Sequence, residues 1–268
     1  MTDDRIPEDA TGAVCTAEGC EPGATGAATG SASALPADTA TSAGRLDVVS
    51  DAICPWCWIG KRQLDLALAE LAARDGLHFE VRWLPFQLNP GMPPEGVDRQ
   101  RYRERKFGSL EHSRQLDAQV AEAGRAVGLE FRHDRMTRTP NTVEAHRLIY
   151  LAEPTGLQGA VVEAIFQAYF HDGRDIGDRA TLAAIGAEAG LDAATLDAFT
   201  EGFAAREEVL TEDHALRSAG LSGVPSFVLD RHLLFSGAVP AVQMAAALRH
   251  AHRVLAERRR EAAGAQAG

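Results

Sequence analysis

Two cysteines three residues apart, Cys54 and Cys57, are the residues of this sequence best suited to chemistry. Pro55 and Trp56 stand between them, and an apolar helical pattern begins at Pro55. Residues three apart on a helix share one face, so the two sulfurs can close a disulfide. In disulfide exchange one thiolate attacks a disulfide, and a second thiol resolves the mixed disulfide. The placement predicts Cys54 as the attacking thiol and Cys57 as the resolving one.

The position of Cys54 at the start of a helix favours its thiolate. Pro55 fits the first helical position, where its missing N–H costs no hydrogen bond. Free amides and the helix dipole stabilise an anion there, which lowers a cysteine pKa from about 8.5 toward the roughly 3.5–7.5 range of such motifs. We therefore expect Cys54 to be the solvent-reachable thiol of low pKa and Cys57 to be shielded. The alternative is that two core cysteines stand three residues apart by chance. Such a pair would not require a preceding strand, a proline at the helix start and a following helix.

A second pair, Cys15 and Cys20, lies in residues 1–44, a segment rich in Ala, Gly, Thr and Ser that we expect to be disordered. One hypothesis makes this pair an auxiliary dithiol that exchanges with the first pair, because about 25 flexible residues span roughly 25–30 Å. The alternative is that these cysteines are incidental or bind a metal weakly. A zinc site made of all four cysteines matches the ligand count but would remove the nucleophile, so we expect no metal.

The strand and helix patterns predict a domain interrupted by a long insertion. Residues 45–97 follow a β-α-β pattern, residues 98–220 are helical throughout, and residues 221–258 follow a β-β-α pattern. A crossover helix joins parallel strands, and the final unit closes a mixed sheet. The expected fold class is α/β, a thioredoxin fold with an all-helical domain inserted in its middle. Residues 259–268 are expected to form a disordered tail.

Within these divisions, periodicity and turn residues predict the individual elements. Asn141, with Glu144 three residues on, is typical of a helix N-cap with a capping box. Asp230 and Arg231 form a tight turn between the last two strands. Strands are expected at 46–50, 78–84, 225–230 and 232–235, and helices at 55–73, 99–107, 110–127, 141–152, 157–171, 179–189, 193–200, 205–219 and 240–258.

Charge and hydropathy argue against several classes of partner. The formal net charge of −11 repels phosphate backbones, so we expect no nucleic-acid partner. No run approaches the roughly 18 apolar residues of a membrane helix, and the first ten residues do not read as a secretory signal. We therefore expect no membrane partner and a cytoplasmic location, where close cysteines are more often catalytic than structural. The basic run 99–106 is interpreted as a solvated helix face.

Three segments carry a family resemblance: residues 51–60 (DAICPWCWIG), residues 139–148 (TPNTVEAHRL), and residues 222–229 with 235–238 (SGVPSFVL and FSGA). Together they resemble the DsbA family of thioredoxin-fold oxidoreductases, in its FrnE-like branch, over about residues 45–258. The same branch is similar to hydroxychromene carboxylate isomerases and kappa-class glutathione transferases. Those enzymes use a serine where this chain has Cys54, so the two cysteines favour dithiol chemistry.

The resemblance implies roles for further residues. Pro225 would be the cis-proline that faces the disulfide, and Val224 would offer backbone groups to an extended peptide substrate. Asn141 would face the cleft above Cys54, unless it serves only as a helix cap. Trp56 is expected to be exposed and to contact the substrate. It stands where the oxidising members have histidine, so a less oxidising protein is expected.

Asp51, three residues before Cys54, has three open interpretations. Its carboxylate could modulate the pKa of Cys54 by disfavouring a second negative charge nearby. It could instead accept a proton from Cys57, or it could simply face solvent.

The motifs and the resemblance predict a dithiol–disulfide oxidoreductase or isomerase acting on thiol- or disulfide-containing proteins or small molecules. No bound cofactor is expected, and glutathione or another dithiol would recycle the cysteine pair. One rival is a glutathione-dependent isomerase or transferase acting on a small aromatic compound. A second rival is a non-catalytic redox-sensing binder or holdase.

Overall fold

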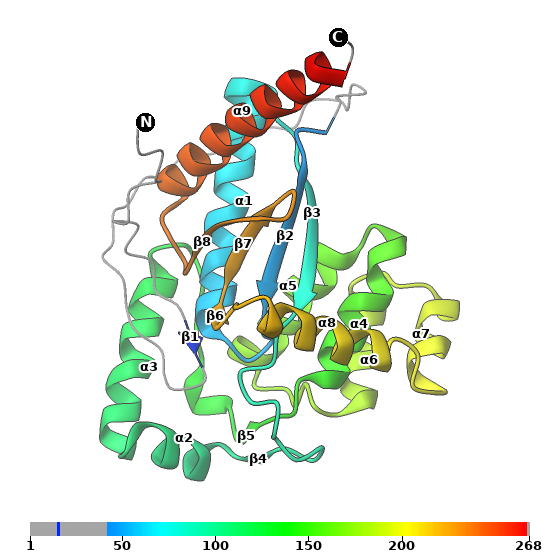
Figure 1. The fold of residues 1–268 in the computed structure, drawn as a ribbon. Coiled ribbons are helices and arrows are strands. Elements are labelled where there is room, and N and C mark those ends of the chain that lie inside the picture. The colour runs from blue at the N-terminus through cyan, green and yellow to red at the C-terminus, as the bar shows by residue number, and fades with distance from the viewer. Residues whose placement is uncertain (1–14, 17–41, 267–268) are drawn as a thin grey trace.

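The computed structural model describes residues 15–16 and 42–266. Its centre is a four-stranded sheet of β2 (Arg45–Ser50), β3 (Glu80–Pro85), β7 (Ser226–Leu229) and β8 (His232–Ser236), in the order β3-β2-β7-β8. Strand β2 runs parallel to β3 and antiparallel to β7, and β7 is antiparallel to β8 (Figure 1). The predicted α/β class, with a mixed thioredoxin-type sheet, is confirmed.

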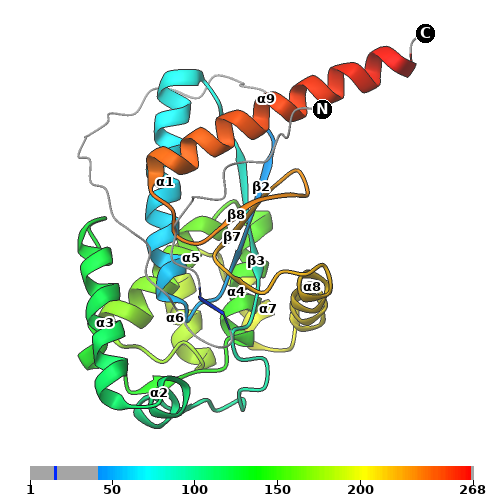
Figure 2. The same ribbon diagram turned by 60° about the vertical axis from the view of Figure 1, so that its left-hand side comes forward.

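The central strand β2 is buried because helices cover the sheet on both sides. Leu46, Val48 and Val49 are fully buried, as expected for a short apolar run inside a covered sheet. Helices α1 (Pro55–Asp75) and α9 (Ala241–Gln266) lie side by side on one face (Figures 1 and 2). Helices α4 (Val143–Ala152), α5 (Gln158–Gln167) and α8 (Arg206–Ser218) contact β3. The first helix is thereby held with its N-terminus at the end of β2.

The segment between β3 and β7 is mainly helical, and the short strand β5 (Arg138–Thr139) within it departs from the expectation that residues 98–220 are helical throughout. A π-helical turn, Ala168–Asp172, continues α5 and accounts for the longer helix expected there. Two short strands, β4 (Val97–Asp98) and β5 (Arg138–Thr139), pair with each other at the edge of this region. The remaining helices are α2 (Arg99–Phe107), α3 (Leu110–Arg125), α6 (Arg179–Glu188) and α7 (Ala193–Thr200).

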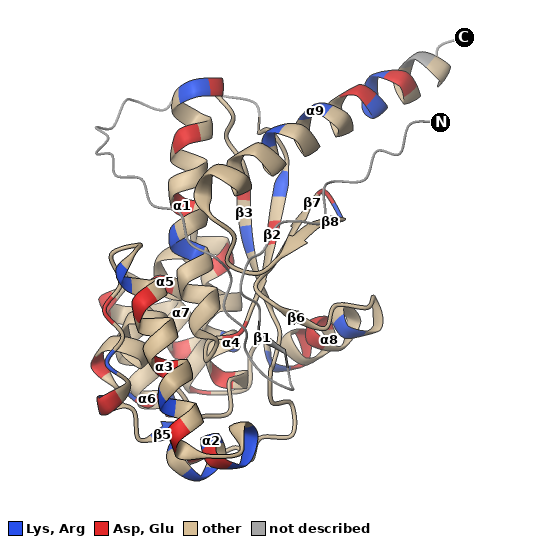
Figure 3. Ribbon diagram, turned by 90° about the vertical axis from the view of Figure 1, so that its left-hand side faces the viewer, with Lys and Arg blue, Asp and Glu red and all other residues tan. Residues whose placement is uncertain are grey.

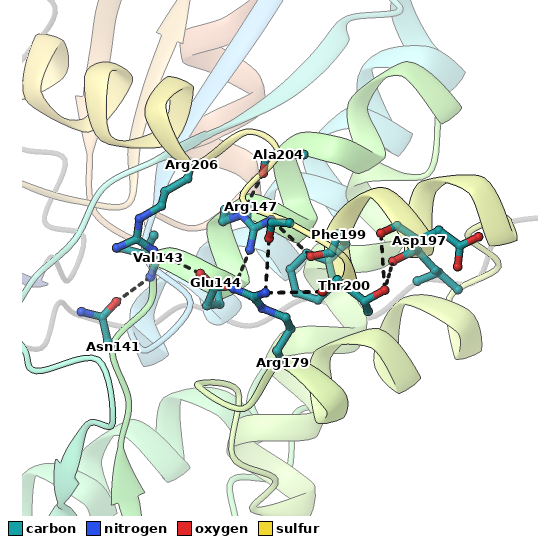
Figure 4. A network of polar contacts seen from close by, with 12 residues as sticks. Asn141, Val143, Glu144, Arg147, Arg179, Asp197, Phe199, Thr200, Ala204 and Arg206 are labelled. Carbon is teal, nitrogen blue, oxygen red and sulfur yellow. Dashed lines mark hydrogen bonds and ion pairs between the residues drawn. The ribbon is translucent and has the colours of Figure 1, made fainter.

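The predicted capping box at the start of α4 is wrong. Thr142 is the N-cap, and the side chain of Asn141 accepts a hydrogen bond from the Val143 amide at 3.0 Å. The carboxylate of Glu144 does not reach back to the cap, because it pairs with one arginine of α4 itself and with two arginines from other helices. Its ion-pair partners are Arg147, Arg179 and Arg206 (Figure 4).

Both predicted tails are partly ordered. Ala43 is buried and its amide donates to the His78 carbonyl at 2.6 Å, so the described fold begins before Arg45. Helix α9 runs to Gln266 instead of ending near residue 258, because Arg and Ala are strong helix formers and residues 257–263 consist of Glu, Arg and Ala. Basic and acidic residues are interspersed along this end of α9 (Figure 3).

A two-residue strand, β1 (Cys15–Thr16), lies within the amino-terminal segment that was expected to be disordered. It pairs antiparallel with β6 (Gly223–Val224), which leads into the last part of the sheet. The other member of the second cysteine pair, Cys20, lies outside the described residues.

Candidate active site

Cys54 occupies the position that the sequence predicted, the N-cap of α1 directly after β2. Pro55 is the first helical residue, and the Cys57 amide donates to the Cys54 carbonyl at 3.0 Å. The Cys54 amide donates to the Asp51 carbonyl at 3.0 Å, which turns the chain from the strand into the helix. Both thiols are free and both are fully buried. The two sulfurs are thus presented by one helical turn.

The segment around Pro225 meets this helical turn from the far end of the sequence. The Val224–Pro225 peptide bond is cis, as the resemblance implied. The Cys54 thiol donates to the Val224 carbonyl, with 3.8 Å between sulfur and oxygen. Gly60 permits the close approach, because a Cβ built on it would lie 3.0 Å from Cγ of Pro225. The structure therefore brings Cys54, Val224 and Pro225 together.

The expected low pKa and solvent access of Cys54 are wrong in this structure. Burial raises the pKa of the Cys54 thiol well above its ordinary value, and the neighbouring Cys57 side chain and the Asp51 carboxylate raise it further. The backbone amide of Cys57 acts in the predicted direction and lowers the pKa of Cys54. The helix terminus thus lowers the pKa of Cys54 as predicted, but desolvation of the thiolate raises this pKa by more.

Asp51 is fully buried, so the interpretation that it faces solvent is wrong. Its Oδ2 accepts the Leu88 amide at 2.6 Å, and its Oδ1 lies 3.5 Å from Nε2 of His146. His146 is also buried, and its Nε2 has no hydrogen-bond partner. Sequence reasoning did not single out this histidine, although it lies in the second family-like segment, residues 139–148. The carboxylate of Asp51 and the imidazole of His146 therefore form a buried pair close to the cysteines.

Replacement of Asp51 by asparagine is expected to lower the pKa of Cys54. The neutral amide keeps an oxygen for the Leu88 amide but no longer opposes a thiolate nearby. The measurement is the pH dependence of Cys54 alkylation in the reduced protein, followed by mass spectrometry. Asp65→Asn is the matched control, since that half-exposed carboxylate lies on the same helix and pairs with Lys61. An unchanged or raised pKa in Asp51→Asn would show that this carboxylate does not modulate the thiol.

With this geometry established, comparison with known proteins identifies the family. The family model of the DSBA-like thioredoxin domain matches residues 45–249. The chain belongs to this family. A probable DsbA oxidoreductase from Streptomyces coelicolor is 33% identical, with a TM-score of 0.69 over 78% of this chain and 89% of its own.

Two more distant DSBA-like neighbours share the fold. A 2-hydroxychromene-2-carboxylate isomerase has a TM-score of 0.57 at 16% identity, over 80% of this chain and 98% of its own. The cytosolic disulfide reductase DsbM from Pseudomonas aeruginosa, in its structure with GSH, has a TM-score of 0.52 at 23% identity, over 81% of this chain and 99% of its own.

Two residues predicted to meet substrate in this DSBA-like chain make contacts within the protein itself. Trp56 is buried, with 5% of its surface exposed, so the expectation of an exposed indole is wrong. Two hydrogen bonds hold the Asn141 side chain: its Nδ2 donates to the Met92 carbonyl at 2.7 Å, and its Oδ1 accepts the Val143 amide at 3.0 Å. Both side chains are drawn into contacts that sequence spacing does not reveal.

A small cavity next to Pro55 corrects the interpretation of the basic run 99–106. The cavity has a volume of about 60 Å³, and the side chains of Arg99, Arg103 and Lys106 line it. Arg99 and Arg103 are largely buried and pair with Asp117 at 3.0 and 2.7 Å. This side of α2 therefore faces Asp117 of α3 and the cavity beside Pro55 instead of solvent.

Neither a membrane helix nor a metal cluster is found in the described part of the chain. No helix there has the length and apolar character needed to cross a bilayer. No group of three or more His, Cys, Asp or Glu side chains within residues 15–16 and 42–266 is arranged to hold a metal ion.

Proposed function

We propose that this DSBA-like protein is a dithiol–disulfide oxidoreductase of the FrnE-like branch, with Cys54 as nucleophile and Cys57 as resolving thiol. The observation that carries the proposal is the position of the Cys54 sulfur, at the first turn of α1 and against the Val224 carbonyl. A substrate strand that pairs beside Val224 would bring its own sulfur to this thiol. The proposed substrates are thiol- or disulfide-containing proteins or small molecules.

The proposed cycle needs only the two thiols of the chain. The Cys54 thiolate attacks a substrate disulfide, one substrate sulfur leaves, and a mixed disulfide forms. Cys57 then attacks the Cys54 sulfur, which releases the second substrate thiol and leaves a Cys54–Cys57 disulfide. Glutathione or another dithiol reduces that disulfide, and no bound organic cofactor takes part. A cytoplasmic location belongs to the same proposal, and the fold shared with cytosolic DsbM supports it.

Equilibration of the purified protein with glutathione buffers tests the proposal. We expect Cys54 and Cys57 to pass from free thiols to one intramolecular disulfide in a single two-electron transition. The two states are counted by alkylation and mass spectrometry, and turnover is followed with a disulfide peptide. A potential above the glutathione poise would indicate an oxidant or isomerase, and one below it a reductase. If no Cys54–Cys57 disulfide forms in oxidised glutathione, the proposed function is wrong.

A glutathione-dependent isomerase or transferase is the second candidate, and one observation favours it. The cavity beside Pro55 is lined by Arg99, Arg103 and Lys106, and its volume of about 60 Å³ suits a single carboxylate group, such as one of those of glutathione. Isomerisation of a small aromatic compound that depends on glutathione and survives Cys57→Ser would support this candidate. Loss of all peptide turnover with Cys57→Ser, and no isomerisation, would support dithiol chemistry. A redox-sensing binder or holdase would form the disulfide but show no turnover.

A further inference from the structure

The strand that leads to the cis-proline has an occupant within the same chain. Strand β1 pairs antiparallel with β6 in a register that places Cys15 opposite Val224 and Thr16 opposite Gly223. Adjacent strands lie roughly 4.8 Å apart, so the Cys15 backbone is the immediate neighbour of the Val224 backbone. Figures 1 and 3 place β1 beside β6, and Figure 1 shows both near the start of α1.

Val224 connects this segment to the proposed nucleophile. Its backbone pairs with Cys15 on one side, and its carbonyl oxygen accepts the Cys54 thiol at 3.8 Å. A slip of one residue would place Thr16, which has no sulfur, opposite Val224. The observed register therefore puts the single cysteine of the strand opposite Val224, the residue whose carbonyl accepts the Cys54 thiol.

The residues around this edge are covered as they would be under a docked peptide. Cys54 and Val224 are fully buried, and Trp56 is 5% exposed. Burial also raises the pKa of the Cys54 thiol. A docking edge that was open to external substrates would leave these groups accessible to solvent.

We propose that the segment containing Cys15 is a resident substrate strand, which docks on Gly223–Val224 and exchanges its thiol with the Cys54–Cys57 disulfide. This inference rests on the proposed dithiol function. The Cys15 thiolate attacks the Cys54 sulfur, the Cys54–Cys57 bond breaks, and a Cys15–Cys54 bond forms. Cys57 leaves as a thiolate and takes up the proton that Cys15 gave up, so the step needs no further oxidant. Attack by Cys57 on Cys54 reverses it.

Docking also makes the resident strand a competitor of external substrates. Residues 17–41 join this segment to the rest of the chain, so docking is intramolecular and its effective concentration at the site is on the order of millimolar. An external peptide must therefore displace β1 before it reaches Cys54.

The covalent step is tested in the full-length Cys57→Ser protein, which cannot reverse the exchange. Brief treatment with oxidised glutathione places glutathione on Cys54, and Cys15 then displaces it. Proteolysis and mass spectrometry should find Cys54 joined to Cys15 within one chain, with at least about tenfold less Cys54–Cys20 linkage if the docked register decides the partner. Adding Cys15→Ser should leave the glutathione adduct, whereas adding Cys20→Ser should retain the Cys15–Cys54 link.

Docking itself is tested without the disulfide. The double variant Cys15→Pro/Thr16→Pro cannot form the β1 pairing, because proline offers no amide to a strand ladder. We expect alkylation of Cys54 in this reduced variant to be about tenfold faster or more, as removal of a protecting segment predicts. Cys20→Pro/Thr25→Pro makes the same change in composition outside β1 and should leave the alkylation rate unchanged.

Two outcomes overturn the proposal, and they differ from failure of the proposed function. Predominant Cys54–Cys20 linkage, or only glutathione and intermolecular adducts, would reject Cys15 as the resident thiol. Equal alkylation rates in the two proline variants would reject docking. In both cases a Cys54–Cys57 disulfide in the wild-type protein would leave the oxidoreductase function standing, whereas its absence would reject that function as well.

Discussion

Replacement of Cys54 by serine is expected to reduce dithiol–disulfide turnover by more than about a thousandfold, as loss of a nucleophile does in covalent catalysis. Serine keeps the helix cap position, but its hydroxyl cannot form the mixed disulfide. Cys57→Ser should abolish turnover too, yet it should still form mixed disulfides, because the Cys54 sulfur remains against the Val224 carbonyl.

The asymmetry between the two variants is the informative measurement. Each is incubated with a disulfide peptide, quenched with acid and analysed by mass spectrometry for the peptide adduct. The adduct should appear on Cys57→Ser and be absent from Cys54→Ser. Cys20→Ser is the control for removal of a cysteine and should turn over like the wild-type protein. Adducts that form through Cys57 in the Cys54→Ser protein would reverse the assigned roles.

Replacement of Arg147 by methionine is expected to destabilise the protein by about 3–5 kcal/mol, the cost of breaking a buried, hydrogen-bonded ion pair. Arg147 is fully buried and pairs with Glu144. Its guanidinium also donates to the carbonyls of Phe199, Gly202 and Ala204, which lie at the end of α7 and in the turn before α8 (Figure 4). Methionine fills much of the volume but leaves Glu144 and three carbonyls without this donor.

Urea denaturation of the wild-type and variant proteins checks this prediction. Arg206→Met is the matched control, because Arg206 also pairs with Glu144 but is 42% exposed, and it should cost about 1 kcal/mol or less. Arg147→Lys should fall between them, since an ammonium cannot serve several carbonyls in one plane. If Arg147→Met does not fold, the comparison of Arg147→Lys with Arg206→Met still tests the prediction. Equal costs for Arg147→Met and Arg206→Met would refute the central role of Arg147.

The elements that position the site follow from local sequence signals. An apolar run ending at Ser50, Pro55 at the first helical position, and the helical pattern after it predict that Cys54 caps α1, and it does. The tight turn at Asp230 and Arg231 is present with positive φ at both residues. These signals suffice to predict the elements because the start of a strand, turn or helix depends on neighbouring residues. A proline favours a helix start, and a short polar turn favours a hairpin.

Long-range packing determined which of the predicted site residues are buried and how their pKa values and contacts change. The pKa of Cys54 is raised, not lowered, because the environment of the sulfur is set by residues far away in the chain, such as Val224. For the same reason Trp56 is buried and Asn141 bonds to Met92.

The sequence by itself determined the fold class, the order of the four strands of the central sheet and of the α-helices, and the cysteine pair at a helix start. Each of these is encoded in periodicity and in residues at neighbouring positions. Only the tertiary structure decided that Arg147 joins the helices of the insertion and that Cys15 pairs beside Val224. Those contacts join residues that lie tens to hundreds of positions apart, and no local pattern records which of them meet.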